Sequence, residues 1–199
     1  SAINCIWDRD IDAVMARTMN RPVAAGRISP RAALIFSLVI GGLGLWSLYR
    51  YLNPFAALTA LFGHFFYVFI YTMWLKRTTP QNIVIGGAAG AIPPIVGWVG
   101  VTGQIDATAI LLFLVVFLWT PPHFWALALN KNTDYSRAGV PMLPVVAGEH
   151  ATHIQMLIYA LALIPVTVLL VFSNSSLGMW SLGAFLTLGV ISAYKTYQL

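Results

Sequence analysis

Charge is scarce in this sequence. Only 9% of its 199 residues are Asp, Glu, Lys or Arg, against roughly 25% in ordinary soluble domains. Because 59% of the residues are hydrophobic and the mean hydropathy is +0.79, too few polar side chains are available to cover a soluble fold. The composition excludes the soluble classes and predicts an integral membrane protein surrounded by a lipid bilayer.

Cysteine is nearly absent, and no nucleotide-binding loop is present. The single cysteine, Cys5, excludes an internal disulfide and fits no multi-cysteine metal site. The run GGAAGA follows no strand pattern and lacks a GK[ST] ending, so we interpret it as a helix-packing surface. The net charge of +5 comes from cations dispersed among apolar runs, which argues against nucleic acid as a partner.

Long charge-free runs predict an all-α fold, a polytopic bundle of transmembrane helices. A span needs about 20 mostly apolar residues. Such runs cover residues 32–49, 51–75, 83–105, 107–130 and 151–194. The last run is too long for one span and is expected to break near residues 173–178, which gives six spans. Residues 4–12 are expected to end an earlier helix, and we interpret residues 1–199 as one domain, truncated at both ends.

The charged residues fall on one side of the predicted bundle. When the connectors are assigned to alternating sides, Arg50 stands apart from the other Lys and Arg residues, and Asp106 from the other acids. An excess of cations marks the cytoplasmic side. We therefore expect a bacterial inner membrane with cytoplasmic loops, or alternatively a mitochondrial inner membrane. Acids and guanidinium groups on one face indicate a site for a metal and a polyanion.

Three oxygen-bearing residues recur at intervals of four in the opening segment NCIWDRDIDAVMARTMNRP. Asn4, Asp8 and Asp12 are each rotated about 40° from the last on a helix, so they share one face. Asp10 lies on another face and is expected to support the site or to pair with Arg9. Carboxylates at this spacing repel each other, and Mg²⁺ with phosphate oxygens removes that repulsion. The spacing therefore predicts a Mg²⁺ site.

Basic residues follow this stripe. Arg17 and Arg21 come directly after it, and Lys76 and Arg77 lie in another connector on the same side. Guanidinium groups suit phosphate oxygens because their planar fork is permanently charged. These residues are candidates for binding phosphate, although topology anchors that reach toward the membrane surface remain an alternative interpretation.

A second polar group lies in the connector NKNTDYSRAGVPMLPVV. Asp134 is its only carboxylate before residue 149 and is a candidate ligand for a second Mg²⁺. Tyr135 and Arg137 follow it, and the prolines of AGVPMLP predict a stiff, non-helical lid. In TPPHFWALAL, His123 is expected about two turns inside the membrane. It either contacts a substrate or satisfies a neighbouring polar group.

These segments together resemble a known family. The Asn-Asp-Asp stripe with the RT..RP residues resembles the first aspartate motif of the UbiA-type intramembrane prenyltransferases. Together with YTMWLKRTTPQNIVIGGAAGAIPPIVGW, TPPHFWALAL and DYSRAGVPMLPVV, it resembles the branch that farnesylates protohaem IX. The resemblance runs over essentially the whole chain. Cys5 and Ala138 stand where many members of the superfamily carry Asp, which is similar to the haem-modifying branch.

The resemblance implies an activity. The farnesyl group of farnesyl diphosphate would pass to a vinyl group of haem b, giving haem O and diphosphate. The implied Mg²⁺ ligands are Asn4, Asp8, Asp12 and Asp134, and the implied catalytic residues are the three aspartates. The diphosphate would be bound by Asn4, Arg17, Arg21, Lys76, Arg77 and Arg137. Haem would contact His123 and Tyr135, and haem A synthase or terminal oxidase assembly factors are the implied protein partners.

Two alternatives stay open. One is a UbiA-type enzyme that acts on an aromatic quinone precursor or a chlorophyllide. The other is a transporter or a haem-binding membrane protein without catalysis, because intramembrane polar residues and broken helices occur there too.

Overall fold

The computed structural model describes residues 2–174 and 177–197, and every regular element within these ranges is a helix. The long elements are α3 (Pro30–Tyr51), α4 (Pro54–Phe65) with the π-helix η1 (Phe66–Leu75), α6 (Asn82–Thr102), α7 (Ala107–Leu129), α9 (Leu143–Ser173) and α10 (Met179–Tyr197). The short helices are α1 (Ala2–Trp7), α2 (Arg9–Val14), α5 (Lys76–Thr78) and α8 (Asn132–Arg137). The predicted all-α bundle is confirmed.

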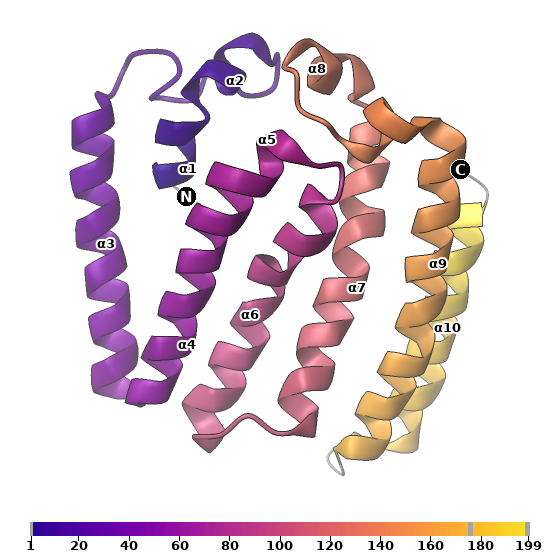
Figure 1. The fold of residues 1–199 in the computed structure, drawn as a ribbon. Coiled ribbons are helices and arrows are strands. Elements are labelled where there is room, and N and C mark those ends of the chain that lie inside the picture. Colours follow the sequence, from indigo (N-terminus) through magenta and orange to yellow (C-terminus); the bar gives the residue numbers. More distant parts are fainter. Residues whose placement is uncertain (1, 175–176, 198–199) are drawn as a thin grey trace.

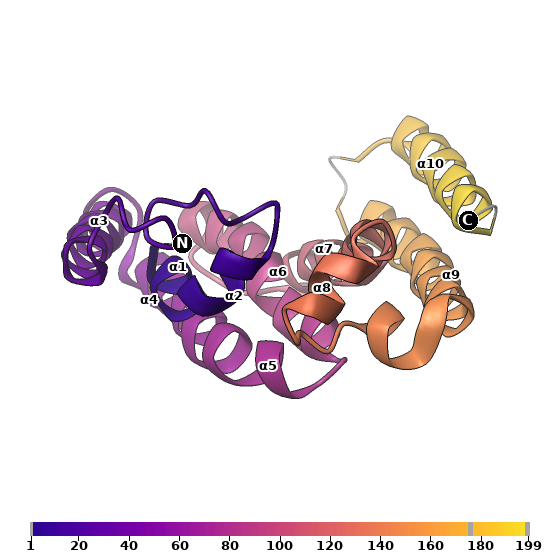
Figure 2. The same cartoon turned by 90° about the horizontal axis from the view of Figure 1, so that it is seen from above.

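The long helices stand side by side in an open curve (Figures 1 and 2). Each packs against the next in the order α3, α4, α6, α7, α9 and α10. The short helices α1, α2, α5 and α8 gather at one end of the bundle, the upper end in Figure 1, and α1 packs against both α3 and η1. This end is called the charged end below.

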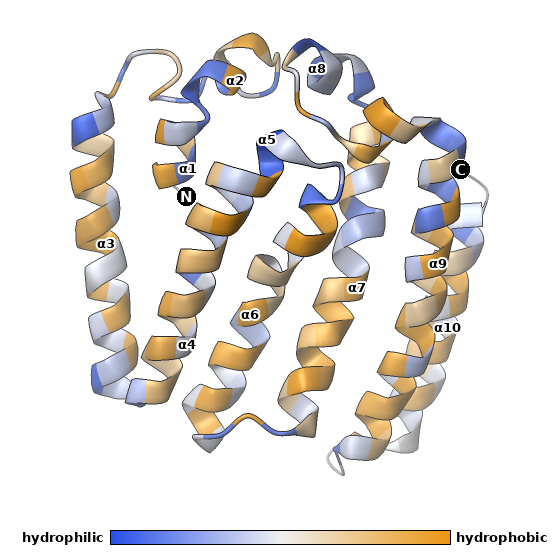
Figure 3. Ribbon diagram, viewed as in Figure 1, coloured by the Kyte–Doolittle hydropathy of each residue, from blue (hydrophilic) through white to orange (hydrophobic). Residues whose placement is uncertain are grey.

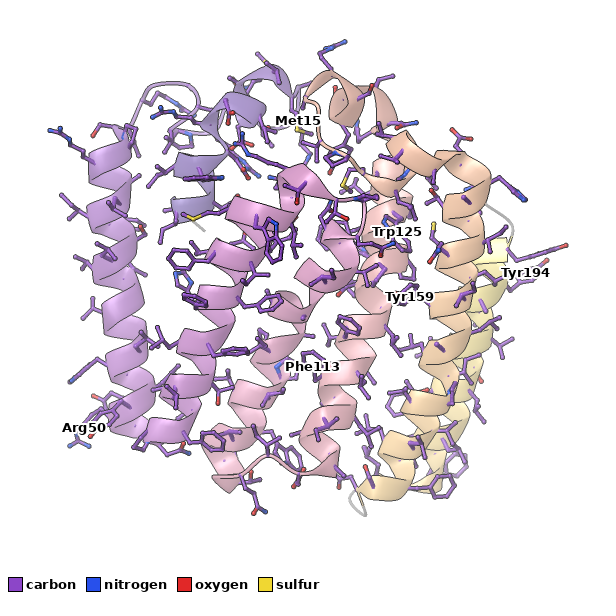
Figure 4. The ribbon with its side chains drawn as sticks, in the orientation of Figure 1. Met15, Arg50, Phe113, Trp125, Tyr159 and Tyr194 are labelled. Carbon is purple, nitrogen blue, oxygen red and sulfur yellow. The ribbon has the colours of Figure 1, made fainter. Side chains whose placement is uncertain are left out.

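Hydropathy separates the charged end from the middle of the bundle. Figure 3 shows the long helices mainly orange and blue residues collected around α2, α5 and α8. Arg50 lies at the far end in Figure 4, and Asp106 precedes α7 at that end, as the alternation of connectors predicts. The two residues that were expected to stand apart therefore do so.

The far end is made of short turns with well-matched caps. The Asn53 side chain accepts a hydrogen bond from the Ala56 N–H at 2.8 Å and donates one to the Val99 carbonyl at 2.8 Å, which ties α4 to α6. Gly103 ends α6 with φ +75°, a conformation that favours glycine. These contacts satisfy backbone groups that the helix ends expose.

Five helical segments are long and apolar enough to cross a membrane. They are Pro30–Tyr51, Pro54–Thr78, Asn82–Thr102, Ala107–Leu129 and Leu143–Ser173. The sixth predicted span corresponds to α10, which is helical but does not reach the same hydropathy because Ser, Thr, Gly and Lys interrupt its apolar residues. The predicted break at 173–178 separates α9 from α10, although residues 175 and 176 lie outside the described part.

Two local predictions at the charged end need correction. Residues 4–12 do not form one regular helix, because the backbone turns at Asp8 between α1 and α2. The predicted non-helical lid is shorter than expected, because α9 begins at Leu143 and holds Pro144 in its first turn, where a proline needs no N–H partner. The irregular segment is therefore residues 138–142, in which Gly139 has φ +65° directly after Ala138, the C-cap of α8.

Residues 138–142, called the roof segment below, cover the apolar core of the charged end. Val140 and Met142 are 2% and 3% exposed and pack in one cluster with Ile11, Met15 and Trp125. Figure 4 shows Met15 and Trp125 toward this end of the bundle. The apolar cluster thus joins α2 and its C-terminal end to the segment between α8 and α9, and it packs both against residues of the long helices α6, α7 and α9.

Candidate active site

Asn4, Asp8 and Asp12 share one face, as predicted from the sequence, although the helix is interrupted at Asp8. The Asp8 N–H donates to the Asn4 carbonyl at 2.9 Å, and the Asp12 N–H donates to the Asp8 carbonyl at 2.7 Å. Because this i to i+4 pattern continues, all three side chains stay on one face and are buried, with exposures of 7%, 0% and 2%. The Asp10 side chain faces outward and is 61% exposed.

Asp8 is surrounded by donors from two other parts of the chain. Its Oδ2 atom pairs with Lys76 Nζ and accepts a hydrogen bond from Asn4 Nδ2 at 2.6 Å. Asn4 in turn donates to Thr72 Oγ1 of η1 at 3.4 Å. The other oxygen, Oδ1, is buried, lies 3.7 Å from an Arg77 nitrogen and accepts no hydrogen bond. A buried carboxylate oxygen in this state is open to a further ligand.

Asp12 is held by the connector that follows α2. Arg21 Nη1 lies 3.0 and 2.9 Å from the two carboxylate oxygens of Asp12. Thr18 Oγ1 donates to the Asp12 carbonyl at 3.2 Å, which folds the connector back over the stripe. Partial burial opposes the charge on Arg21, but the hydrogen bonds and attraction from Asp12 outweigh it and raise the pKa of Arg21.

Arg77 has a different partner from the one expected. Its guanidinium donates to both oxygens of Asp10, at 2.8 and 2.7 Å, and to the Trp7 carbonyl at 2.9 Å. This pairing lowers the pKa of Asp10 to about 2. Asp10 therefore pairs with Arg77 in place of the expected Arg9, and the contact fastens α5 to the turn between α1 and α2.

Most of the predicted phosphate-binding residues meet in one polar cavity of about 230 Å³. Its polar lining comes from residues that are far apart in the sequence, namely Asn4, Asp12, Arg17, Thr18, Arg21, Lys76 and Tyr135. Val140 and Met142 of the roof segment line it from the other side. Both the stripe and the connector after α7 therefore contribute to a single cavity, the connector through Tyr135, Val140 and Met142 and not through the predicted Asp134.

An apolar chamber of about 620 Å³ adjoins the polar cavity. Tyr67, Tyr71, Ile83 and Phe124 line both spaces, so the two meet at this ring of residues. Below the ring the chamber runs between η1, α4, α6 and α7, and its lining carries no charged residue apart from the titratable His64. A polar head and an apolar tail on one ligand would match this division.

Glycines of α6 bring the walls of the chamber close together. A Cβ atom at Gly86 would lie 2.1 Å from Tyr71 Cδ2, and one at Gly87 would lie 3.0 Å from Thr120 Cγ2. The small residues therefore let η1 and α7 approach the α6 backbone, as the packing interpretation of GGAAGA predicts. Gly90 also lines the chamber, and a Cβ there would meet no atom within 4 Å.

Three predicted residues lie elsewhere. Asp134 is half-buried on α8 and does not line the polar cavity, whereas the neighbouring Tyr135, 8% exposed, does. Arg137 is exposed and lines a separate groove. His123 stacks on Trp119, with ring centroids 4.3 Å apart, and lines a cavity of about 190 Å³ toward α9 and α10. Within the described residues, no three His, Cys, Asp or Glu side chains lie close enough to hold a metal.

Several residues of the site were not singled out from the sequence. Thr72, Tyr67 and Tyr71 come from η1, and π-helical turns are often found at functional sites. Asn82 is fully buried and its Nδ2 atom donates to the Thr79 carbonyl at 2.6 Å and to the Pro141 carbonyl at 3.4 Å. It thereby ties the roof segment to the start of α6. Its place beside the GGAAGA run was the only available signal.

The sequence profile of the UbiA prenyltransferase family matches residues 1–199. The chain belongs to this family. Its fold agrees, because a UbiA homolog from Archaeoglobus fulgidus, solved bound to GPP and Mg²⁺, superposes with a TM-score of 0.72. That match covers 97% of this chain and 68% of the other at 16% identity, so it supports the fold alone. UbiA membership and the helical bundle also make the protein an integral membrane protein.

Curated UbiA relatives are named protoheme IX farnesyltransferase. The protein from Symbiobacterium thermophilum is 59% identical over 175 residues, which cover 88% of this chain and 58% of that protein. The one from Picosynechococcus is 52% identical over 197 residues, which cover 99% and 62%. Protoheme IX farnesyltransferase 2 from Mesorhizobium japonicum is 58% identical over 167 residues, which cover 84% and 53%. The chain thus spans roughly three fifths of the length of these relatives.

Proposed function

We propose that this UbiA protein transfers the farnesyl group of farnesyl diphosphate to a vinyl group of protohaem IX. The observation that carries the proposal is a pair of buried carboxylates beside a cationic cavity that opens into an apolar chamber. Asp12 lines this cavity, and Asp8 pairs with Lys76, which lines it. Such a division suits a diphosphate head on an isoprenoid tail. The names of relatives that are 52–59% identical supply the acceptor, protohaem IX.

The donor set suits Mg²⁺. Asp8 and Asp12 offer hard carboxylate oxygens, and Asp8 Oδ1 is buried without a hydrogen bond. Mg²⁺ prefers one or two protein carboxylates with substrate phosphates and water completing its shell. The ion would neutralise charge on the departing diphosphate. The UbiA homolog of similar fold was solved with GPP and Mg²⁺ bound, and the proposed ligands here are of the same chemical kind, an isoprenoid diphosphate with Mg²⁺.

The chain's own residues would bind and orient the head group. Lys76, Arg21 and Arg17 line the cavity and would neutralise the leaving diphosphate, the charge that grows as the allylic C–O bond breaks. Tyr135 lies at the same cavity and would contact the head group more directly than haem. Arg137 and His123 line other cavities, Asp134 does not line the polar cavity, and all three are left out of this assignment.

The apolar chamber would hold the farnesyl tail. A volume of about 620 Å³ lies within the range typical of small-molecule sites, roughly 300–1,000 Å³. Tyr67, Tyr71 and Phe124 lie where the two cavities meet, called the neck below, and their rings would exclude water from the allylic carbon. Attack by the vinyl carbon, followed by water at the remaining cationic carbon, would give a hydroxyethylfarnesyl group and release one proton.

The experiment is mass analysis of haem after incubation with the full-length protein. Purified protein in detergent, farnesyl diphosphate, Mg²⁺ and haem b should give the mass of haem O, and no mass gain would refute the proposal. A parallel panel with an aromatic quinone precursor tests the other acceptor class.

We further propose that the protein lies in the inner membrane of a bacterium, with its charged end facing the cytoplasm. Its proposed protein partners are haem A synthase or the terminal oxidase assembly machinery.

A further inference from the structure

Both buried carboxylates of the stripe are already paired with cations. Asp8 pairs with Lys76 and Asp12 pairs with Arg21 at 2.9 Å. The same two cations line the polar cavity, where a diphosphate would need them. The groups suited to a metal and the groups suited to a phosphate therefore neutralise each other.

We propose that the site takes up Mg²⁺ and diphosphate together, through an exchange of these ion pairs. The metal takes over Asp8 and Asp12, and the released Lys76 and Arg21 turn to the phosphate oxygens. This inference rests on the proposed function and describes how that site is loaded. Its consequence is that metal and diphosphate each bind weakly alone and strongly together.

The charge balance favours joint loading. Asp8 and Asp12 pair with Lys76 and Arg21, Arg77 is balanced by Asp10, and Arg17 also lines the cavity, so the site carries one net positive charge. A divalent metal alone would add to this excess, while a diphosphate ester alone brings about three negative charges and leaves the site negative. The complex of the two carries about one negative charge and matches the site. Buried charge that is not balanced is strongly unfavourable.

The packing shows which partners can move. Asp8 is fully buried and held by Asn4, which is held by Thr72, so the carboxylate has a fixed position. The side chains of Lys76 and Arg21 are 16% and 33% exposed, so each can swing toward the cavity without unfolding the core. The carboxylates therefore stay in place while the cations exchange partners.

Arg77 is not expected to take part. It makes hydrogen bonds to both oxygens of Asp10 and to the Trp7 carbonyl, and it does not line the polar cavity. An exchange would break three hydrogen bonds outside the cavity. Arg77 also lies 3.7 Å from Asp8 Oδ1, but Lys76 and Arg21 are the two cations that both pair with the stripe and line the cavity.

The exchange predicts an unusual response to removal of a cation. Lys76 competes with a metal for Asp8, so Lys76→Gln should tighten the binding of metal alone. The same variant should weaken joint binding, because the phosphate loses a cation. A lysine that served only to stabilise the fold, or only to attract phosphate, would give no gain in metal affinity.

The test uses Mn²⁺ as the metal probe on the purified full-length protein in detergent. Titration followed by the electron paramagnetic resonance signal of free Mn²⁺ gives the affinity for metal alone. We expect at least a fivefold tightening in Lys76→Gln, a coupling in the ordinary range for linked sites. Lys131→Gln is the matched control, because Lys131 is exposed and has no ion pair within the described residues, and it should bind as the wild type does.

Joint loading is measured by thermal unfolding with Mg²⁺, with inorganic diphosphate and with both. In the wild type, the shift with both should exceed the sum of the separate shifts, and in Lys76→Gln the excess should fall by at least half. Additive shifts in the wild type, or Mn²⁺ binding that is unchanged or weaker in Lys76→Gln, would overturn the exchange.

A second variant protects the test against loss of folding. Arg21→Gln removes the partner of Asp12 from a surface connector, and Arg31→Gln, at an exposed arginine without an ion pair in the described chain, is its control. Tighter Mn²⁺ binding is expected in Arg21→Gln and not in Arg31→Gln.

Haem mass analysis on the same protein preparations separates the two proposals. Formation of haem O without tighter Mn²⁺ binding in the variants refutes only the exchange of ion pairs. Tighter Mn²⁺ binding in the variants without formation of haem O refutes only the proposed acceptor.

Discussion

Aspartates precede helices at both ends of this UbiA bundle, and they behave differently. At the far end, Asp106 precedes α7 and its Oδ1 accepts a hydrogen bond from the Ala109 N–H at 3.0 Å. At the charged end, Asp8 precedes α2, yet its side chain caps nothing and faces Lys76. The Asp106 position stabilises a helix end, whereas the Asp8 position gives up that contact.

The difference shows where the chain keeps polar groups that its own fold does not need. Asn53, Gly103 and Asp106 at the far end satisfy backbone groups, and none of them needs a ligand to complete its contacts. At the charged end, carboxylates are buried against cations, an arrangement that is often no more stable than apolar packing. Such expensive charges near a membrane surface are expected to have a function.

The largest contrast should appear between Asp8→Asn and Asp106→Asn. Asp8→Asn removes a proposed metal ligand, and we expect haem farnesylation to fall at least about a hundredfold. Asp106→Asn keeps an N-cap of similar strength, so activity should stay within about twofold. Initial rates from haem mass analysis measure both. Comparable losses in the two variants would contradict the assignment of different roles.

The glycines offer the next contrast. Gly86→Ala places a Cβ 2.1 Å from Tyr71 Cδ2, so the ring must move at the neck between the two cavities. We expect about a tenfold loss of activity, because small displacements near a reacting group are costly. Gly103→Ala instead strains a backbone at φ +75° and should cost about 1 kcal/mol of stability with little loss of activity. Rates and thermal unfolding midpoints distinguish these outcomes.

The features that follow a local period were predictable from the sequence. Asn4, Asp8 and Asp12 share a face because each is four residues from the next, and the backbone hydrogen bonds across the break keep that spacing. The spans follow from runs of apolar residues longer than the bilayer requires. An asparagine before a proline, such as Asn53 before Pro54, is a residue type that favours the start of a helix, so its local conformation follows from the sequence.

The partners of these residues were not predictable, because they depend on how distant segments pack. Lys76 lies 68 residues from Asp8, and the packing of α1 on η1, together with the contacts of Arg77, brings them together. On α8, a helix of six residues, too few positions exist to show which face is buried, so Tyr135 could not be separated from Asp134. The π-helical turns of η1 have no simple sequence pattern.

A smaller contrast is expected between two asparagines. Asn82→Ala frees the roof segment from the start of α6 and should raise the KM for farnesyl diphosphate about threefold, a change of less than about 1 kcal/mol. Asn53→Ala removes a cap and the contact with Val99, so it should lower stability by about 1–2 kcal/mol without changing KM. Steady-state kinetics at varied farnesyl diphosphate decide the point, and equal KM values would remove the role of Asn82.

The smallest effect concerns the exposed pair at the charged end. Arg77 lowers the pKa of Asp10 from 3.8 to about 2, so the pair stabilises the fold fully above pH 4–5 and this contribution is lost as the pH falls toward 2. Because Asp10 is 61% exposed, solvent screening limits the effect to about 0.5 kcal/mol or less. Asp10→Asn should therefore lower the unfolding midpoint slightly and equally from pH 5 to 8, with the difference closing below about pH 4. A difference that varied between pH 5 and 8 would show that Asp10 is coupled to the buried pairs of Asp8 and Asp12, and the separation of Arg77 from the cavity would then be wrong.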